Sequence, residues 1–411
     1  MKRGVWNWLF LISVFSTGLF SGVLIWQQMF PEWRGYQAEY YRRLAQVTGD
    51  PAKARTPLAI RQIYLPEMHR TDRCITCHVG VDNPKMADQP QPFRTHPDMG
   101  DPSFLATHPF TEMGCTVCHH GQGSATIKEH AHGRVAHWEE PLLPKDLTIS
   151  TCAVCHQNVM DLKQARPLVE AKALMDEKGC LGCHALNGAG QQLAPELSET
   201  AHKATDELDF RHVNGEHTVH NWIYDHFKDP QRVMPGDSAQ GIPESAMPNF
   251  ELSEEETVKL TALILSFAEA KGDEGHPIPS RFRVAAAPTP APPPVTYASP
   301  AEKGAAVFKK YGCAACHGIG GRGGVRSKNM YPGEEEPPLI YIGGGYTKEE
   351  IKEVIRKGRY PARADSSGPS PVLWMPAWKD RIPEDEIDAL ADYLLSLYPE
   401  PGQQAVQPVK K

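Results

Sequence analysis

The sequence lacks an excess of positive charge, lacks long apolar stretches beyond its first 30 residues, and has no cysteine outside one short repeated motif. Its 411 residues carry 50 Asp and Glu against 43 Lys and Arg, a net charge of −7, which excludes a basic nucleic-acid-binding protein. Hydrophobic residues make up 40% and the mean hydropathy is −0.44, so the chain is not a polytopic membrane protein. At roughly 100–200 residues per domain, this length predicts two to four domains.

All ten cysteines belong to C-x-x-C-H units, the signature of c-type haem attachment. In such a unit two thiols form thioethers to one porphyrin, and the His is placed as the proximal iron ligand. Disulfides need no His after every second Cys, and a zinc ribbon pairs two C-x-x-C units without one. The sequence therefore predicts five covalently bound haem c groups. The units are Cys74, Cys77 and His78; Cys115, Cys118 and His119; Cys152, Cys155 and His156; Cys180, Cys183 and His184; Cys313, Cys316 and His317.

Residues 4–26 contain no charged side chain and are long enough to cross a bilayer as a helix. Lys2 and Arg3 precede this stretch, and tryptophans bracket it at positions 6, 8, 26 and 33. A cleaved signal peptide is the alternative, but the stretch is longer than a usual signal core and no A-x-A site closes it. We therefore expect a single-pass anchor in the bacterial cytoplasmic membrane. Haem attachment to these motifs takes place outside the cytoplasm, so the bulk of the chain is expected on the periplasmic side.

The spacing of the motifs predicts the domain organisation of a mainly α protein. The first three motifs lie too close together for separate monohaem domains, which predicts an irregular, haem-packed module. The last two have longer territories with helix signals, including capping boxes that begin at Ser253 and Thr347. The expected parts are a transmembrane anchor at 1–30, a trihaem module at 31–164, a helical domain at 165–275, a Pro-rich linker at 276–299, a second helical domain at 300–400 and a tail at 401–411.

A run of alanines and prolines between residues 285 and 300 separates the two helical domains. Such a segment forms a semi-rigid, extended spacer at about 3.1 Å per residue. It is either an inert spacer or a tether that lets the last haem swing towards a partner, and we favour the tether.

The two helical territories resemble class I monohaem cytochrome c domains. Each places C-x-x-C-H after a helix, followed by a Pro–Leu or Pro-x-Leu step, a Met–Pro pair and a final amphipathic helix. The resemblance implies that Met247 and Met375 are the distal iron ligands, with Met234 as a competitor in the first territory. It also implies that Gly304 and Phe308 pack the first helix of the last domain against its final helix.

The resemblance further implies a hydrogen bond that orients each proximal imidazole. In the family a proline carbonyl accepts the ring N–H of the proximal His. Pro195 occupies that part of the pattern in the first territory, and Pro337 or Pro338 occupies it in the second. Such a bond would fix the orientation of the ring.

The trihaem module has no Met–Pro pair but carries seven histidines beyond the proximal ones, which predicts bis-histidine ligation and lower potentials than His/Met ligation. These histidines are His69, His96, His108, His120, His130, His132 and His137. We expect His96, His108 and His137 to be distal ligands. His137 and His132 both lie between the second and third motifs, and the pairing of any distal His with a given iron stays open.

The whole chain resembles the membrane-anchored multihaem cytochrome c subunits of quinol-oxidising complexes, such as alternative complex III or cytochrome bc-type complexes. The resemblance implies electron transfer from such a complex to a soluble cytochrome or a terminal oxidase, by a subunit that is not a catalyst on its own. The alternatives are a stand-alone anchored quinol dehydrogenase, and a haem peroxidase or reductase with an open iron site. No nucleotide-binding loop, hydrolytic triad or nucleic-acid signature is present in the sequence.

Overall fold

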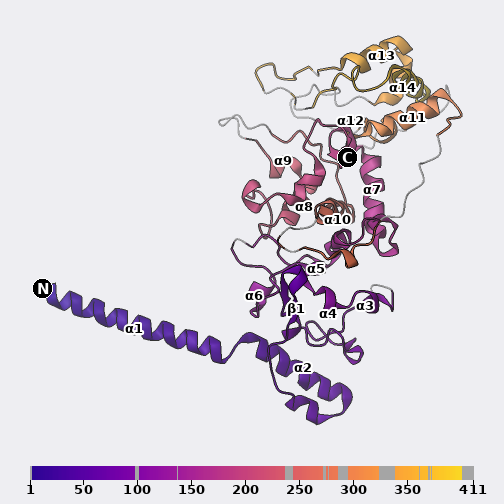
Figure 1. The fold of residues 1–411 in the computed structure, drawn as a ribbon. Helices are drawn as coiled ribbons and strands as arrows, with labels where there is room; N and C mark the ends of the chain where they lie inside the picture. Colours follow the sequence, from indigo (N-terminus) through magenta and orange to yellow (C-terminus); the bar gives the residue numbers. More distant parts are fainter. Residues whose placement is uncertain are drawn as a thin grey trace. The chain divides into compact units, whose positions relative to one another are not determined.

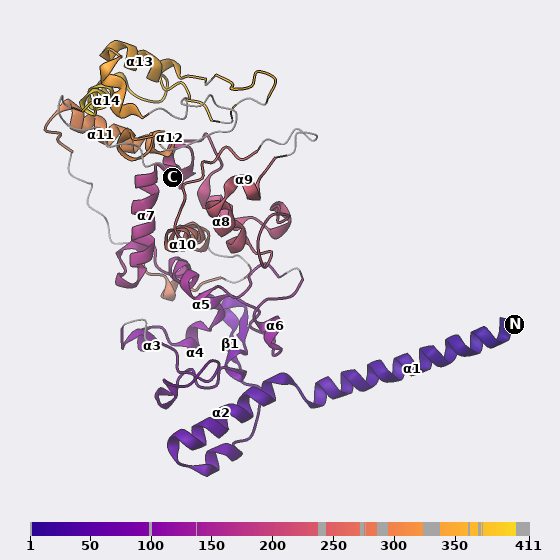
Figure 2. The same cartoon turned by 180° about the vertical axis from the view of Figure 1, so that it is seen from behind.

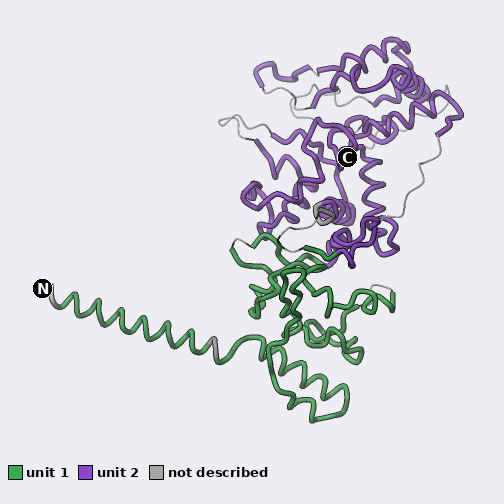
Figure 3. Tube along the Cα trace, in the orientation of Figure 1, with its two compact units in different colours: residues 1–144, 273–279 green, residues 145–272, 280–411 purple. Residues whose placement is uncertain are grey.

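The computed structural model describes residues 2–97, 101–136, 138–236, 244–271, 275, 277–285, 295–323, 338–360, 362–368, 371 and 373–399. These residues confirm a mainly helical protein. The chain separates into two compact units, residues 1–144 with 273–279 and residues 145–272 with 280–411 (Figure 3). Each unit is described by itself.

The unit boundary groups the motifs differently from the domain limits expected from the sequence. The expected limits place the third motif with the first two, at 31–164. In the structure the third motif begins inside the 3-10 helix η5 (Lys145–Val154), which packs along α10 (Glu254–Lys271) of unit 2. The packing therefore joins the third motif to the helical domains.

Unit 1 begins with two helices and continues in short elements (Figure 1). Helix α1 contains the stretch Gly4–Trp26, which is long and apolar enough to cross a membrane. Pro31 precedes α2, and Gly49 ends it in the left-handed conformation at φ 67°. The elements are α1 (Lys2–Met29), α2 (Glu32–Thr48), β1 (Ile63–Leu65), β2 (Arg70–Asp72), α3 (Phe104–Thr107), α4 (Phe110–Met113), α5 (Thr116–His119) and α6 (Lys128–Ala131).

Helix α2 holds the first haem-attachment motif in place. Gln37 on α2 is fully buried, and its side-chain amide donates to the carbonyl of Thr76 at 2.9 Å, inside that motif. Tyr40 and Tyr41, also on α2, pack in an apolar cluster with Val79, the residue after the motif. Strands β1 and β2 pair antiparallel beside the motif, with Ile63 opposite Asp72.

Unit 2 contains helices of 10–18 residues, together with shorter ones, that form two helical bodies. Leu168, Ala171 and Met175 on α7 are fully buried, and α7 packs against α10. The capping boxes expected at Ser253 and Thr347 are both formed. The elements are α7 (Arg166–Lys178), β3 (Ala185–Leu186), β4 (Ala189–Gly190), α8 (Val219–Lys228), α9 (Pro230–Val233), α10, α11 (Pro300–Lys310), α12 (Ala314–His317), α13 (Lys348–Lys357) and α14 (Glu384–Ser396).

Helices α11 and α14 lie side by side in both views (Figures 1 and 2). Gly304 allows this approach, since a Cβ added there would lie 2.0 Å from the Ala389 carbonyl oxygen. Phe308 packs edge-to-face on Tyr393 with ring centroids 5.5 Å apart. The contact expected of Gly304 and Phe308 is therefore present.

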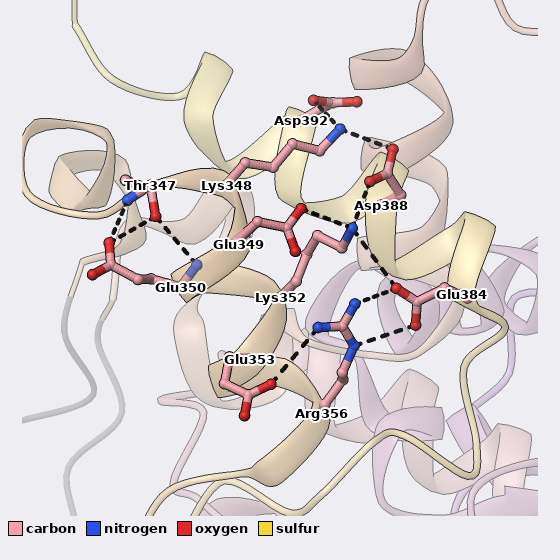
Figure 4. Close-up of polar contacts among 10 residues, drawn as sticks. All are labelled: Thr347, Lys348, Glu349, Glu350, Lys352, Glu353, Arg356, Glu384, Asp388 and Asp392. Atoms are coloured by element: carbon pink, nitrogen blue, oxygen red, sulfur yellow. Dashed lines mark hydrogen bonds and ion pairs between the residues drawn. The ribbon is translucent and has the colours of Figure 1, made fainter.

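Ion pairs fasten α13 to α14 over the core of the last body (Figure 4). Lys348 lies 2.8 Å from both Asp388 and Asp392, and Lys352 lies 2.9 Å from Asp388. Arg356, one turn after Lys352 on α13, forms an ion pair with Glu384 on α14. The Lys352 side chain is only 10% exposed, so its ion pairs are the least open to screening by salt. The network therefore fixes how α13 lies on α14.

We predict that Gly304→Val lowers the free energy of unfolding of the last body by about 1–3 kcal/mol, because the added side chain pushes α11 away from α14. Chemical denaturation of the holoprotein measures this change. Gly345→Val is the matched control, since a Cβ at Gly345 meets no atom within 4 Å. Equal stability of the two variants would contradict the close helix crossing.

Candidate haem-attachment sites

All five C-x-x-C-H motifs fold into the same turn. In each, the backbone N–H of the His donates to the carbonyl oxygen of the first Cys, at 2.9, 3.0, 2.9, 3.0 and 3.0 Å in chain order. Residues three and four positions apart lie on one face of a helical turn, so the two thiols and the imidazole point to the same side. None of the ten cysteines is in a disulfide. The turn is the geometry that double thioether attachment and proximal ligation require.

The environment of the thiols suits thioethers better than metal thiolates. Burial raises the pKa of the Cys180 and Cys313 thiols to about 12, and that of Cys77 and Cys152 to about 11. Metal sites built from cysteine need the deprotonated thiolate, which burial disfavours here. A neutral sulfur bonded to a porphyrin carries no such penalty. The donor set therefore fits covalent haem.

Burial lowers the pKa of four of the proximal imidazoles and so favours their neutral form; they are His78, His119, His184 and His317. Burial lowers the pKa of His317 to about 4. Burial, followed by the charges on His132 and His119, lowers the pKa of His78 to about 4. Neutral imidazole is the form that binds a metal. His132 is thus within electrostatic range of His78.

A buried carboxylate holds the second motif against the first. Asp72, 1% exposed at the end of β2, accepts hydrogen bonds from the backbone N–H groups of Cys115 and Thr116, and from the Thr116 hydroxyl at 2.8 Å. The Cys115 thiol also lies within hydrogen-bond reach of Cys74. Sequence reasoning missed Asp72, because no spacing rule links it to a motif more than 40 residues away.

His96 faces the second proximal imidazole. The ring centroids of His96 and His119 lie 6.0 Å apart, with the planes at 67°. His96 Nδ1 lies 2.7 Å from the Pro97 carbonyl oxygen, which identifies Nδ1 as the protonated nitrogen and leaves Nε2 able to bind a metal. The two imidazoles therefore lie next to each other at the second motif.

The other expected distal histidines are less directly placed. His108 stacks on Phe104 at 4.6 Å, and Phe104 in turn stacks on His96 at 6.0 Å, so His108 is one ring removed from the pair. His137 lies outside the described residues. The sequence held no signal that distinguishes His132 from His137, and the structure places His132 within electrostatic range of His78.

The third motif is held by a segment that follows α10. Val284 donates its N–H to the Cys155 carbonyl oxygen at 2.8 Å and accepts from the N–H of Gln157 at 3.0 Å. Residues about 130 positions apart in the sequence thus form a short parallel bridge at His156. This contact, together with the packing of η5 on α10, fixes the motif within unit 2.

The fourth motif shows the expected proline contact. His184 Nδ1 lies 2.8 Å from the Pro195 carbonyl oxygen. Met247 is half-buried, and its carbonyl accepts a hydrogen bond from the Gln231 side chain. The competitor Met234 is 41% exposed. The structure therefore holds the Met247 loop in place and leaves Met234 at the surface.

His226 on α8 is a residue that sequence reasoning missed near the fourth motif. Its ring stacks on Trp222 with centroids 4.8 Å apart, and its buried Nδ1 has no hydrogen-bond partner within the described part of the chain. Burial, and then the charge on His184, lowers its pKa to about 4. Its only sequence signal was its place on an amphipathic helix, which is equally typical of a core position.

The fifth motif has its expected Met held by backbone contacts. Met375 and Arg359 exchange two backbone hydrogen bonds of 2.9 Å. Gly358, at φ 72°, ends α13 against this bridge, and a Cβ added there would lie 2.4 Å from the Met375 carbonyl oxygen. Of the two candidate prolines, Pro337 lies outside the described residues. The Pro338 carbonyl oxygen accepts from the Tyr341 N–H at 3.4 Å.

Comparison with known proteins matches both helical bodies. Residues 168–268 match the family described as Cytochrome c, and residues 299–394 match the one described as Cytochrome C oxidase, cbb3-type, subunit III. The chain is 39% identical to cytochrome c6 of Euglena gracilis over 95 residues, which are 22% of this chain and 85% of that protein. It is 36% identical to cytochrome c6 of Euglena viridis over 97 residues, 23% of this chain and 87% of that protein. No solved structure matches significantly.

We predict that Asp72→Asn lowers the free energy of unfolding by about 1–3 kcal/mol, because an amide cannot accept all three hydrogen bonds of the second motif. Haem occupancy at this motif is expected to fall as well. Denaturant titration and intact mass measure the two effects. Asp88→Asn, at an exposed position, is the control. Unchanged stability and full occupancy in Asp72→Asn would contradict this role.

On the expectation that Met375 ligates the iron at the fifth motif, we predict that Gly358→Ala displaces Met375 and lowers the reduction potential there, because the loss of thioether ligation lowers the potential. Redox titration and the thioether-to-iron charge-transfer band of the ferric protein measure this. Met375→Ala should give the same change in full, and Gly345→Ala none. A Gly358→Ala protein with wild-type band and potential would refute the positioning by Gly358.

Proposed function

This chain belongs to the cytochrome c family, and from that premise we propose that it is a membrane-anchored pentahaem cytochrome that carries electrons from a quinol-oxidising membrane complex to a soluble or membrane-bound acceptor. The single observation that carries the proposal is the turn that all five C-x-x-C-H motifs share. Bound haem c supplies reversible one-electron chemistry, and the protein residues set its orientation and potential.

The residues that would hold the five groups follow from the contacts at each motif. The ten cysteines would form the thioethers, and His78, His119, His156, His184 and His317 would be the proximal ligands. As second ligands we propose His96 for the motif of His119, which its ring adjoins, and His132 for the motif of His78, whose pKa its charge lowers. We propose Met247 opposite His184 and Met375 opposite His317. His108 and His137 remain candidate distal ligands, and their pairing with a given motif stays open.

The distribution of these ligands supports a direction of electron transfer. Imidazole pairs are associated with lower potentials than His/Met pairs. Unit 1, which begins with α1, carries the imidazole pairs, and unit 2 carries both methionines. Electrons delivered from a quinol at the membrane would therefore run downhill along the chain. Asp72, Gln37 and Val284 would act by fixing the attachment turns to which the groups are bonded.

Helix α1 supports the membrane location. We propose that it is a retained anchor in the bacterial cytoplasmic membrane and that the rest of the chain lies in the periplasm, where haem attachment takes place. A partner complex would then supply the quinol chemistry. A soluble cytochrome or a terminal oxidase would accept the electrons.

We predict that the protein extracted from its native membranes has the mass of the polypeptide plus five haems and co-purifies with subunits of a quinol-oxidising complex. Replacing residues 1–30 by a cleavable signal peptide should release a soluble protein that keeps all five haems. Intact mass and the identities of the co-purifying subunits measure both points. An isolated chain that oxidises quinol by itself would favour the stand-alone dehydrogenase, and fewer than five haems would refute the pentahaem proposal.

A further inference from the structure

The fourth and fifth attachment motifs touch through their glycine backbones, within unit 2. A Cβ added at Gly182 would lie 2.7 Å from the Gly312 carbonyl oxygen and 2.8 Å from Gly312 Cα. A Cβ added at Gly312 would lie 2.3 Å from the Gly182 nitrogen, and one at Gly179 would lie 2.7 Å from the Ala315 nitrogen. All four residues are buried. We name this contact of Gly179, Gly182, Gly312 and Ala315 the glycine seam.

Two of the glycines have a local reason to be glycine. Gly179 at φ 77° follows α7, and Gly312 at φ 64° follows α11, so both adopt the left-handed conformation that side chains disfavour. Gly182 has no such constraint, since its φ is not positive. Only its contact with Gly312 requires the absence of a side chain.

Comparison of the five motifs shows that haem attachment does not require glycine at position 182. The residue before the second Cys is larger in each of the other four motifs, where it is Thr76, Val117, Val154 or Ala315. All five motifs nevertheless form the same turn. Glycine at this position is therefore explained by the seam and by nothing in the attachment chemistry.

We propose that the glycine seam is a docking interface that holds the two cytochrome c bodies of unit 2 as one fixed pair, with their haem-attachment turns in direct backbone contact. Neither turn can approach the other this closely with a side chain between them. The stretch between residues 285 and 300 then connects two docked bodies, which differs from the swinging tether expected from its composition.

The pairing of the two bodies deepens the proposed function. It rests on that function in one respect, which is that both turns carry haem. One electron would leave the group bonded to Cys180 and Cys183 and reduce the group bonded to Cys313 and Cys316. The first group is oxidised as the second is reduced, and no proton or third carrier takes part. A fixed contact makes this transfer independent of any domain movement.

Hydrogen exchange of the full-length holoprotein, read by mass spectrometry, tests the seam. Peptides that cover residues 179–184 and 307–316 are expected to be protected in the wild type. In Gly182→Val both peptides are expected to exchange at least about tenfold faster, because the added side chain separates the turns. Gly182→Ala is expected to give a smaller change in the same direction. Val154→Ala, at the matching position of the third motif, should leave both peptides unchanged.

Two outcomes would overturn the proposal. One is a Gly182→Val protein in which only peptide 179–184 changes while peptide 307–316 keeps its wild-type rate. The other is a wild type in which the two peptides exchange as fast as unprotected chain. If Gly182→Val prevents haem binding, the Gly182→Ala variant decides the test. Alanine is compatible with the attachment turn, because the fifth motif carries Ala315 at the equivalent position. The haem count in the same spectra tests the pentahaem proposal separately, so its failure is distinguishable from failure of the seam.

Discussion

The hydrogen bond from each motif His N–H to the carbonyl oxygen of the first Cys is the interaction on which the rest of the structure depends. It closes a single helical turn that presents two thiols and one imidazole together. A four-residue helix is not stable alone, because nucleation fixes several dihedral angles for one hydrogen bond. Each turn therefore needs support from elsewhere in the chain. The supports are Thr76 bonded by Gln37, Cys115 bonded by Asp72, Cys155 bonded by Val284, and the glycine seam.

These supports explain why the two units look different. Beyond α2, the described residues of unit 1 form only helices of four residues, 3-10 turns and one short strand pair, so side-chain-to-backbone bonds such as those of Asp72 carry its organisation. Unit 2 has helices long enough to pack against each other, and the fourth and fifth attachment turns follow α7 and α11. In the last body, α11 crosses α14 closely at the point where Gly304 contacts the backbone of Ala389. The apolar fraction of 40% is consistent with a chain whose interior is completed by cofactors.

The sequence predicted what depends on local pattern, and it missed what depends on distant contacts. The attachment turns and α10 with its cap at Ser253 follow from motifs and periodicity. The approach at Gly304 follows from the resemblance to class I cytochrome c domains, and the structure contains each of these features. Asp72 and Val284 bond motifs from far along the chain through irregular segments, which carry no periodic signal. The choice between His132 and His137 stays open, since both lie between the second and third motifs in the sequence and His137 lies outside the described residues.

Gly182 shows how the two kinds of information combine. Within its own motif Gly182 occupies the position before the second Cys, where the five motifs carry different residues. Its backbone conformation would accept alanine. Only the structure shows that the atoms facing it belong to another attachment turn. Only the sequence shows that the other four motifs do without glycine there. A residue that one motif needs and its four equivalents do not is best explained by a contact unique to that motif. Here that contact joins the two cytochrome c bodies, which contain the expected methionine ligands. In the proposed electron-transfer sequence, the two haem sites of higher potential therefore lie in a fixed pair of bodies.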